Sequence, residues 1–162
     1  MAAHFLVADN LPGKLTIMPC PSGDQLAADM AGFAVAGIDR IVSMLAPDEI
    51  VMLGLAQEPV LARQNGITFE DHAIVDFGLP DRRAFQTLVS GIVEELRAGR
   101  HVAVHCRAGI GRSGMVVGAV LIALGASAQG AIDRVSTARG VSVPDTIEQR
   151  QFMYEFATGL RA

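Results

Sequence analysis

The sequence has no tryptophan, a single tyrosine and only two cysteines in its 162 residues. Two cysteines, Cys20 and Cys106, cannot build a disulfide framework, and the Cys and His spacing of a structural zinc site is missing. A long apolar run is missing too, because the uncharged stretch 113–132 has an apolar centre, residues 115–126, that is too short to cross a bilayer. We therefore expect no structural metal and no membrane span, and interpret this stretch as a buried helix.

A strong charge of one sign is also absent. Thirteen Lys and Arg residues stand against seventeen Asp and Glu residues, which gives a formal net charge of −4. This balance supplies no general attraction to nucleic acid or to an anionic membrane, so neither is expected as a partner. The N-terminus has no cationic start and only a short apolar stretch before Asp9, unlike a secretory signal. We therefore expect a cytoplasmic protein.

The pattern of apolar residues indicates one α/β domain spanning residues 1–162. Hydrophobic residues make up 51% and charged residues 19% of the chain, as in a compact globular fold. Segments with helical spacing alternate with short runs typical of strands. We expect helices at 24–37, 47–64, 82–98, 112–124, 128–138 and 145–159, and strands at 40–45, 67–75 and 101–105. This alternation favours a mostly parallel central sheet flanked by helices, with ligands bound beyond the carboxyl ends of the strands.

The segment from His105 to Gly114 combines several features of an anion-binding turn. Cys106 leaves an apolar strand, and Gly109 and Gly111 follow, which tolerate positive φ and let successive backbone N–H groups turn around one tetrahedral anion. The N-terminus of the next helix adds its dipole, and this positive field favours the thiolate of Cys106. The turn therefore predicts a phosphate-binding loop with a nucleophilic cysteine, between a strand and a helix.

Two residues at the end of this turn fit the same chemistry. The planar guanidinium of Arg112 can hold two phosphoryl oxygens at once, and the Ser113 hydroxyl can donate to the cysteine sulfur. Each residue type alone has an ordinary structural explanation, because free cysteines are often buried, glycines serve tight turns and serine often begins helices. Their combination favours function. Nucleotide binding is disfavoured, since neither the dinucleotide glycine spacing nor a Gly-Lys-Ser/Thr sequence is present.

His105 and Cys106, five intervening residues, and then Arg112 and Ser113 resemble the signature loop of the cysteine-dependent protein tyrosine phosphatase superfamily. Residues 75–81, Val-Asp-Phe-Gly-Leu-Pro-Asp, resemble the aspartate-bearing loop of its small dual-specificity and kinase-associated members. The order of elements over most of the chain is also similar to these compact phosphatases. The resemblance implies a phosphatase-like α/β fold and a metal-independent phosphomonoester hydrolase that uses no cofactor.

The resemblance also implies a role for each matching residue. Cys106 would attack phosphorus and form a cysteinyl-phosphate, while Asp76 would protonate the leaving oxygen and later accept a proton from water. Ser113 would stabilise the departing thiolate. His105 would help to orient the loop, although a satisfied histidine at a strand end is equally compatible with the sequence. The phosphate oxygens would be held by the guanidinium of Arg112 and by the backbone amides of Arg107, Ala108, Gly109, Ile110, Gly111 and Arg112.

Several neighbouring residues have structural interpretations. Asp81 directly precedes an expected helix, where aspartate is a preferred N-cap, so we favour a cap over a second acid. Asp71 and His72 are expected on an exposed strand face. Arg107 has two open interpretations, a solvated surface charge or a contact for an acidic flank or second phosphate. Cys20 is interpreted as inert, with a redox role left open.

The segment from Asp145 to Gln151 also has two interpretations. Thr146 with Gln149, or Asp145 with Glu148, fits a capping box at the start of the last helix. In larger tyrosine phosphatases a related segment supplies glutamines that position the hydrolytic water, and Gln149 lies near one of those positions. The leading glutamine of that pattern is Asp145 here, so capping is the favoured interpretation.

The expected substrate is a phosphorylated protein, with phosphotyrosine first, or a small phosphorylated molecule. Without tryptophan, the deep aromatic slot of tyrosine-specific domains is not assured, and Phe77 is the aromatic residue best placed in sequence to touch a phenyl ring. Two alternatives stay open: a phosphate-binding module without turnover, and a cysteine-based sulfurtransferase or arsenate-reducing enzyme. The oligomeric state is not determined by the sequence.

Overall fold

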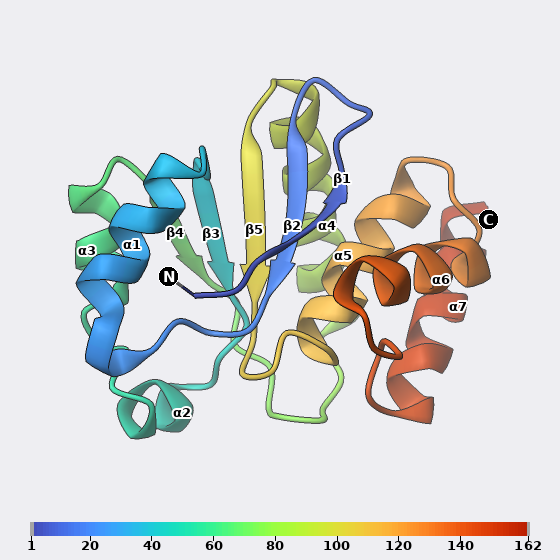
Figure 1. The fold of residues 1–162 in the computed structure, drawn as a ribbon. Coiled ribbons are helices and arrows are strands. Elements are labelled where there is room, and N and C mark those ends of the chain that lie inside the picture. Colours follow the sequence, from blue (N-terminus) through green and yellow to red (C-terminus); the bar gives the residue numbers. More distant parts are fainter. Residues whose placement is uncertain (1, 162) are drawn as a thin grey trace.

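The computed structural model describes residues 2–161 and shows a five-stranded sheet with helices on both faces (Figure 1). Strands β2, β5, β3 and β4 are parallel, and β1 pairs antiparallel with β2 at one edge of the sheet. The mostly parallel α/β sheet predicted from the sequence is therefore confirmed. In sheet order the strands are β1 (Phe5–Ala8), β2 (Lys14–Met18), β5 (His101–His105), β3 (Arg40–Ser43) and β4 (Thr68–Asp71).

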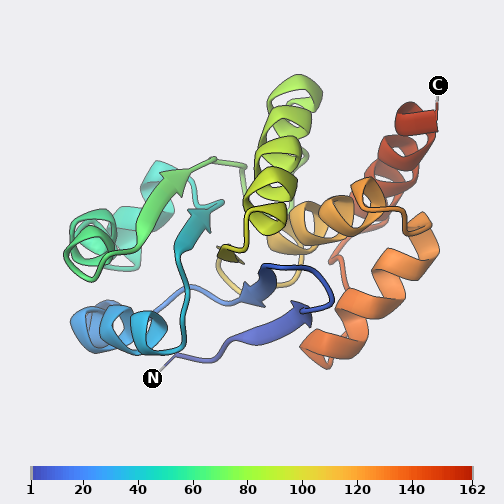
Figure 2. The ribbon, with the colours of Figure 1, turned by 90° about the horizontal axis from the view of Figure 1, so that it is seen from above.

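Figure 2 separates the helices into two groups. Helices α1 and α3 lie on one side of the sheet, while α4 and α5 lie on the other, with α6 and α7 packed against α5. Helix α2 follows β3 beyond the end of the sheet. The helix bounds are α1 Leu26–Val35, α2 Pro47–Met52, α3 Glu58–Gln64, α4 Arg82–Arg97, α5 Arg112–Ala123, α6 Ala128–Arg139 and α7 Ile147–Arg161, with a short 3-10 turn at Gly23–Gln25.

The central strand β5 and the helix that follows it form the middle of the core. All five residues of β5 are buried, and they alternate between the two faces. Val102 and Val104 pack into the cluster with α4 and α5, while Ala103 packs into the cluster with α1 and α3. Helix α5 is buried on nearly all sides, as its uniformly apolar sequence predicts. No helix of residues 2–161 is long and apolar enough to cross a membrane.

Two predicted elements differ from the structure by more than two residues. The helix expected at 47–64 is divided into α2 and α3, because Gly54 between them has a φ of +70°, in the left-handed region that a right-handed helix excludes. The strand expected at 67–75 is only β4, because its partner β3 ends at Ser43, which is paired with the last residue of β4, Asp71. The last helix begins at Ile147, two residues after the position expected.

The N-terminal hairpin of β1 and β2 is an element that the sequence reasoning missed. Strand β2 lies between β1 and β5 and buries Leu15 and Ile17 in the core. Gly13, just before β2, comes so close to the end of α4 that a Cβ there would lie 2.7 Å from the Leu96 carbonyl oxygen. Both strands are too short for their alternation to predict them.

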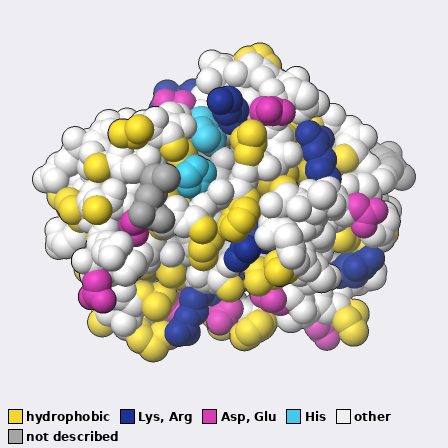
Figure 3. All heavy atoms as spheres, in the orientation of Figure 1, with side chains coloured by type: hydrophobic (Ala, Val, Ile, Leu, Met, Phe, Trp, Pro, Cys, Tyr) yellow, Lys and Arg dark blue, Asp and Glu magenta, His cyan; other side chains and the backbone are white. Residues whose placement is uncertain are grey.

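The carboxyl ends of the four parallel strands meet at the edge of the sheet that lies at the bottom of Figure 1. The segment after β5, which holds the predicted phosphate-binding turn, leaves the sheet at this edge. In Figure 3, hydrophobic, basic and acidic side chains lie next to one another along the same lower edge. The fold therefore places the predicted turn where parallel α/β sheets bind ligands.

Candidate active site

The turn between β5 and α5 is shaped by two glycines with different functions. Gly109 has a φ of +71°, and a Cβ there would lie 2.4 Å from the carbonyl carbon of Met18. Gly111 has a φ of −78°, so it does not use the positive φ that glycine tolerates. The lack of a Cβ at Gly111 leaves room for two neighbouring side chains, since a Cβ would lie 2.5 Å from Asp145 Oδ2 and 2.8 Å from Gln149 Oε1. A Cβ at Gly109 would meet backbone in a left-handed conformation, whereas a Cβ at Gly111 would have to displace the Asp145 and Gln149 side chains.

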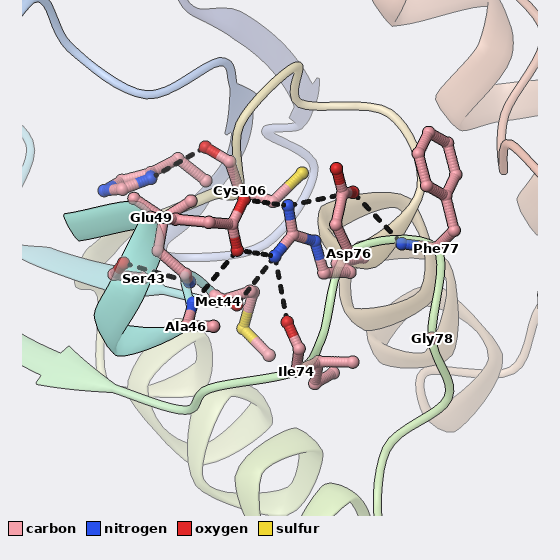
Figure 4. A network of polar contacts seen from close by, with 12 residues as sticks. Ser43, Met44, Ala46, Glu49, Ile74, Asp76, Phe77, Gly78 and Cys106 are labelled. Atoms are coloured by element: carbon pink, nitrogen blue, oxygen red, sulfur yellow. Dashed lines mark hydrogen bonds and ion pairs between the residues drawn. The ribbon is translucent and has the colours of Figure 1, made fainter. Parts of the chain in front are cut away.

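Arg112, at the start of α5, is held by a carboxylate from α2. Its Nη1 and Nη2 donate to Glu49 Oε1 and Oε2 at 2.6 and 2.9 Å, and Nη1 also donates to the Ile74 carbonyl at 2.9 Å (Figure 4). The Arg112 side chain is only 1% exposed, and Glu49 is buried too. Two parallel hydrogen bonds fix the plane of the guanidinium as well as its position.

The charges of this pair stabilise each other. The hydrogen bond from Arg112 lowers the pKa of Glu49, and this effect exceeds burial, which acts in the opposite direction. Burial alone would lower the pKa of Arg112, but the hydrogen bond to Glu49 and the charges of Cys106, Glu49 and Asp76 raise it overall. Arg112 and Glu49 are therefore both ionised at neutral pH.

Asp76 lies on the loop between β4 and α4 and faces the same guanidinium. Its Oδ1 is 3.0 Å from Arg112 Nη2, and its side chain is 39% exposed. The backbone N–H of Phe77 donates to Asp76 Oδ1 at 3.0 Å, and that of Gly78 donates to the Val75 carbonyl at 2.7 Å. This tight turn gives Phe77 a φ of +59° and leaves its ring exposed (Figure 4). The structure thus brings Asp76 and Arg112, which the sequence assigns to one site, into contact.

His105 is completely buried behind Cys106 and contacts a second glutamate. Its Nε2 lies 2.7 Å from Glu58 Oε1, at the start of α3, and its Nδ1 lies 3.2 Å from the Cys106 carbonyl oxygen. Glu58 is also buried. The histidine is thus satisfied at the end of its strand, and it contacts the backbone of the cysteine.

Ser113 and Gln149 are both buried beside the turn. The Ser113 Oγ has no hydrogen-bond partner among the described residues. The Gln149 N–H donates to Thr146 Oγ1 at 3.0 Å, and the Thr146 N–H donates to Gln149 Oε1 at 3.2 Å, which confirms the predicted capping box. Gln149 Nε2 also lies 3.4 Å from the Gly78 carbonyl oxygen, so this side chain connects α7 to the loop that carries Asp76.

Asp145 is a second carboxylate at this edge, which the sequence reasoning treated only as a possible cap. It lies against Gly111, as the clash with a Cβ there indicates. Burial and then the negative charge of Asp76 raise the pKa of Asp145, while Arg112 and a backbone hydrogen bond at Gly111 act in the opposite direction. Two carboxylates therefore lie near one guanidinium, and the charge of Asp76 disfavours ionisation of Asp145.

The remaining predicted residues lie around this centre. Asp81 caps α4, because its Oδ1 accepts from the Ala84 N–H at 2.9 Å, as expected. Asp71 is exposed at the end of β4, and Arg107 is exposed after Cys106. Cys20 is a free thiol, and burial, then the charges of Glu58 and Cys106, raise its pKa to about 11. Such a thiol is uncharged at neutral pH and a poor nucleophile.

Three residues that contact the site were not predicted from the sequence. Two of them are Glu49 and Glu58. The third is Arg139 of α6, which donates from Nε to the Gly109 carbonyl at 3.1 Å and from Nη2 to the Ala108 carbonyl at 2.9 Å. Arg139 thus binds two carbonyl oxygens of the turn. A buried Arg or His requires an acceptor, but nothing in the local sequence identifies which distant residue supplies it.

The arrangement is suited to bind and attack a tetrahedral anion. A thiol, a fixed guanidinium and the N-terminus of a twelve-residue helix meet at one turn, with a half-exposed carboxylate opposite. The positive charge of Arg112 is fixed in the buried part of the site. The carboxyl group of Asp76, which can exchange a proton, lies in the more exposed part. Among residues 2–161, no three or more His, Cys, Asp or Glu side chains are placed to hold a metal ion together.

Comparison with known proteins places these features in a family. Residues 19–126 match the family model described as "Tc-R-P: Polymorphic toxin system, DSP-PTPase phosphatase". Cyclin-dependent kinase inhibitor 3 of Rattus norvegicus is 34% identical over 104 residues, and that of Homo sapiens is 33% identical over 104 residues. Each match covers 63% of this chain and 49% of the relative, so the chain spans about half the length of these curated relatives.

Solved structures agree with the family model. Kinase associated phosphatase, with its catalytic cysteine replaced by serine, is 25% identical with a TM-score of 0.89, and the match covers 99% of this chain and 97% of that one. The active form of Tk-PTP is 24% identical with a TM-score of 0.76, covering 90% of this chain and 92% of that one. The phosphatase-like α/β fold expected from the two sequence motifs is confirmed.

Proposed function

The chain belongs to the DSP-PTPase phosphatase family, and we propose that it hydrolyses phosphomonoesters through a cysteinyl-phosphate intermediate. The observation that carries the proposal is the placement of Arg112 between Glu49 and Asp76, at the first turn of the helix that follows Cys106. A guanidinium fixed on two sides in a buried site is preorganised for the equatorial oxygens of a phosphoryl group.

In the first step the thiolate of Cys106 attacks phosphorus. The sulfur–phosphorus bond forms while the bond to the leaving oxygen breaks, and Asp76 gives that oxygen a proton. Arg112 and the backbone N–H groups of residues 107–112 hold the three remaining oxygens. The half-exposed position of Asp76 supports this role, because the carboxyl group can reach both the leaving group and water.

In the second step water attacks the phosphorus of the intermediate. Asp76, now ionised, accepts a proton from the water, and the sulfur leaves as a thiolate that the Ser113 hydroxyl stabilises. The buried Ser113 Oγ lacks another partner among the described residues, which supports this assignment. Gln149 lies beside the turn and contacts the Asp76 loop, and we propose that it helps to orient the water. The reaction as written requires neither a metal nor a cofactor.

We propose phosphoproteins as substrates, with phosphotyrosine first. Relatives named for a cyclin-dependent kinase and a kinase-associated phosphatase support a phosphoprotein. The exposed ring of Phe77 lies directly after Asp76 and is 63% exposed, so it can contact the phenyl ring of a bound phosphotyrosine. A phosphothreonine has no ring to make this contact.

The test is phosphate release from matched phosphotyrosine and phosphothreonine peptides in excess EDTA, with Cys106→Ser as the blank. We expect the phosphotyrosine peptide to be cleaved at least about tenfold faster, which corresponds to ~1.4 kcal/mol in transition-state binding. Asp76→Asn should slow an unactivated aryl phosphate by ~10²–10⁴-fold and spare an activated one in part.

Other outcomes identify the alternatives. Stoichiometric peptide binding without phosphate release would indicate a binding module. Persulfide formation from thiosulfate without phosphatase turnover would indicate a sulfurtransferase. Equal loss of activity in Asp76→Asn on both aryl phosphates would contradict the assignment of Asp76 as the acid. Loss of activity in EDTA that a divalent cation restores would contradict metal independence.

A further inference from the structure

The contact between His105 and Glu58 poses a question of proton count. His105 Nε2 lies 2.7 Å from Glu58 Oε1, and Nδ1 lies 3.2 Å from the carbonyl oxygen of Cys106. A carbonyl oxygen and an ionised carboxylate are acceptors only, whereas a neutral imidazole has a single N–H donor. With Glu58 ionised, both contacts can be hydrogen bonds at the same time only if both ring nitrogens carry a proton.

The number of protons on this pair matters because both side chains are buried. His105 has no exposed surface, and Glu58 is only 1% exposed, so water cannot satisfy a missing hydrogen bond. Burying an ionised carboxylate is costly unless an opposite charge accompanies it. A histidine cation satisfies both requirements at once. The two side chains come from β5 and α3, so the pair joins the central strand to the helix layer on the α1 side.

Other ionisable groups face the pair from three directions. Asp71 at the end of β4 has a raised pKa because of burial and then the negative charge of Glu58, while the charge of His105 acts in the opposite direction. The thiol of Cys20, after β2, also has its pKa raised by burial and then by Glu58. On α3 itself, the positive charge of Arg63 acts on Asp71. Asp71 and Glu58 are thus two acidic groups near His105.

We propose that Glu58 is a positioning residue of the active site, which keeps His105 doubly protonated beside Cys106. The proton on Nδ1 then holds the Cys106 carbonyl in place, and the positive ring lies one residue from the thiolate. The proposal rests on the proposed function in taking Cys106 as the nucleophile. It adds a group on a separate helix that controls the charge behind the nucleophile.

The chain offers a matched control for this pair. His72 Nε2 lies 2.5 Å from Glu70 Oε1 in the same type of contact, but both side chains are partly exposed and lie away from Cys106. Glu70→Gln therefore removes a His–Glu contact outside the site, together with the ion pair between Glu70 and Arg40. Glu58→Gln keeps the shape of the buried side chain and removes its charge.

The first measurement observes the protonation state of His105 directly. The ring nitrogens of the four histidines are observed by ¹⁵N NMR from pH 5.5 to 8.5, and His105→Asn assigns the signal of interest. We expect both nitrogens of His105 to stay protonated over this whole range in the native chain. In Glu58→Gln the ring should become singly protonated within the range, and in Glu70→Gln it should stay doubly protonated. A singly protonated His105 in the native chain would overturn the proposal.

The second measurement follows the cysteine directly. The rate of iodoacetamide alkylation at Cys106 is measured against pH, and the Cys106 peptide is quantified by mass spectrometry so that Cys20 does not contribute. We expect the midpoint in Glu58→Gln to rise by about one pH unit, a tenfold slower reaction below the midpoint. Glu70→Gln should give the native curve. A folded Glu58→Gln protein that gives the native curve would also overturn the proposal.

The pH profile of phosphate release separates this role from a structural one. In Glu58→Gln, kcat/KM should fall about tenfold at low pH and approach the native value at high pH, where both proteins have a thiolate. A uniform loss at every pH would indicate a purely structural Glu58 and contradict the proposal. If the native chain releases no phosphate at all, the proposed function fails, while the NMR and alkylation measurements still decide the role of Glu58.

Discussion

Two glutamates approach the turn after β5 from neighbouring helices, and their partners differ in one respect. Glu49 of α2 holds Arg112, which faces the site and also contacts Asp76. Glu58 of α3 holds His105, which is completely buried and faces only the backbone of Cys106. Arginine is charged with or without a partner, whereas the charge of a histidine depends on its surroundings.

By our proposal, the same residue type therefore has two different roles at one site. Glu49 orients a charge that exists anyway, since two parallel hydrogen bonds fix the guanidinium plane. Glu58, by our proposal, maintains a charge that would otherwise be lost. Removing Glu49 should therefore change geometry and stability, while removing Glu58 should change a pH profile. The following predictions test this difference.

The largest effect is expected from Arg112→Lys, which keeps the positive charge and removes the planar guanidinium group. A lysine cannot bind Glu49 and two phosphate oxygens in the same geometry, so kcat/KM for an aryl phosphate should fall by about 10²–10³-fold. Arg97→Lys at the exposed end of α4 is the control and should leave the rate unchanged. A loss of less than about fivefold in Arg112→Lys would show that charge alone suffices. It would also contradict the role of Glu49 in orienting the guanidinium plane.

A smaller effect on rate, with a clear effect on stability, is expected from Glu49→Gln. The change leaves a buried guanidinium without its carboxylate, which should lower the free energy of unfolding at pH 7 by about 3 kcal/mol in urea titrations. The pKa of Glu49 is lowered in the folded state, so the pair's contribution is complete above the ordinary carboxyl pKa of about 4.3 and is lost as the pH falls through the lowered value.

The acid limb of the stability curve therefore distinguishes the native chain from this variant. The difference in unfolding free energy between the two should shrink as the pH falls below about 4. A difference that stays constant down to the lowest pH would contradict the assignment of the stabilisation to an ionised Glu49. The alkylation curve of Cys106 should move less in Glu49→Gln than in Glu58→Gln, because Arg112 keeps its charge.

The smallest effect is expected from Asp145→Asn. Burial and the charge of Asp76 raise the folded pKa of Asp145 above its unfolded value, so its ionised form is unfavourable in the folded chain. This penalty develops as the pH rises above about 3.9 and is complete above the folded pKa. The variant should thus be more stable than the native chain at pH 7, by less than about 1 kcal/mol because the side chain is exposed.

At low pH, where Asp145 is protonated in both states, the two proteins should be equally stable. Thermal melting at both pH values makes this comparison. A variant that is less stable than the native chain at pH 7 would mean that the hydrogen bond at Gly111 outweighs the repulsion from Asp76.

Local features account for the successful sequence predictions. The buried strand β5, the turn after it and the helix α5 follow one another without a gap, and each is determined by short-range preferences of glycine and apolar residues. The cap at Asp81 and the box of Thr146 with Gln149 are equally local, since each joins residues three positions apart. Asp76 was selected by a resemblance of motifs, and in the structure its Oδ1 lies 3.0 Å from Arg112 Nη2.

The sequence by itself determined the turn between β5 and α5, because the residues that shape it are contiguous and their backbone preferences act over a few bonds. Only the tertiary structure decided which carboxylates contact Arg112 and His105. Since β3 lies beside β5, the segments that follow β3 are carried to the end of β5, and Glu49 and Glu58 reach Arg112 and His105 there. The order of strands in the sheet determines which residues become these partners. The local sequence around Arg112 and His105 requires only a buried acceptor within hydrogen-bond distance and does not specify which residue supplies it.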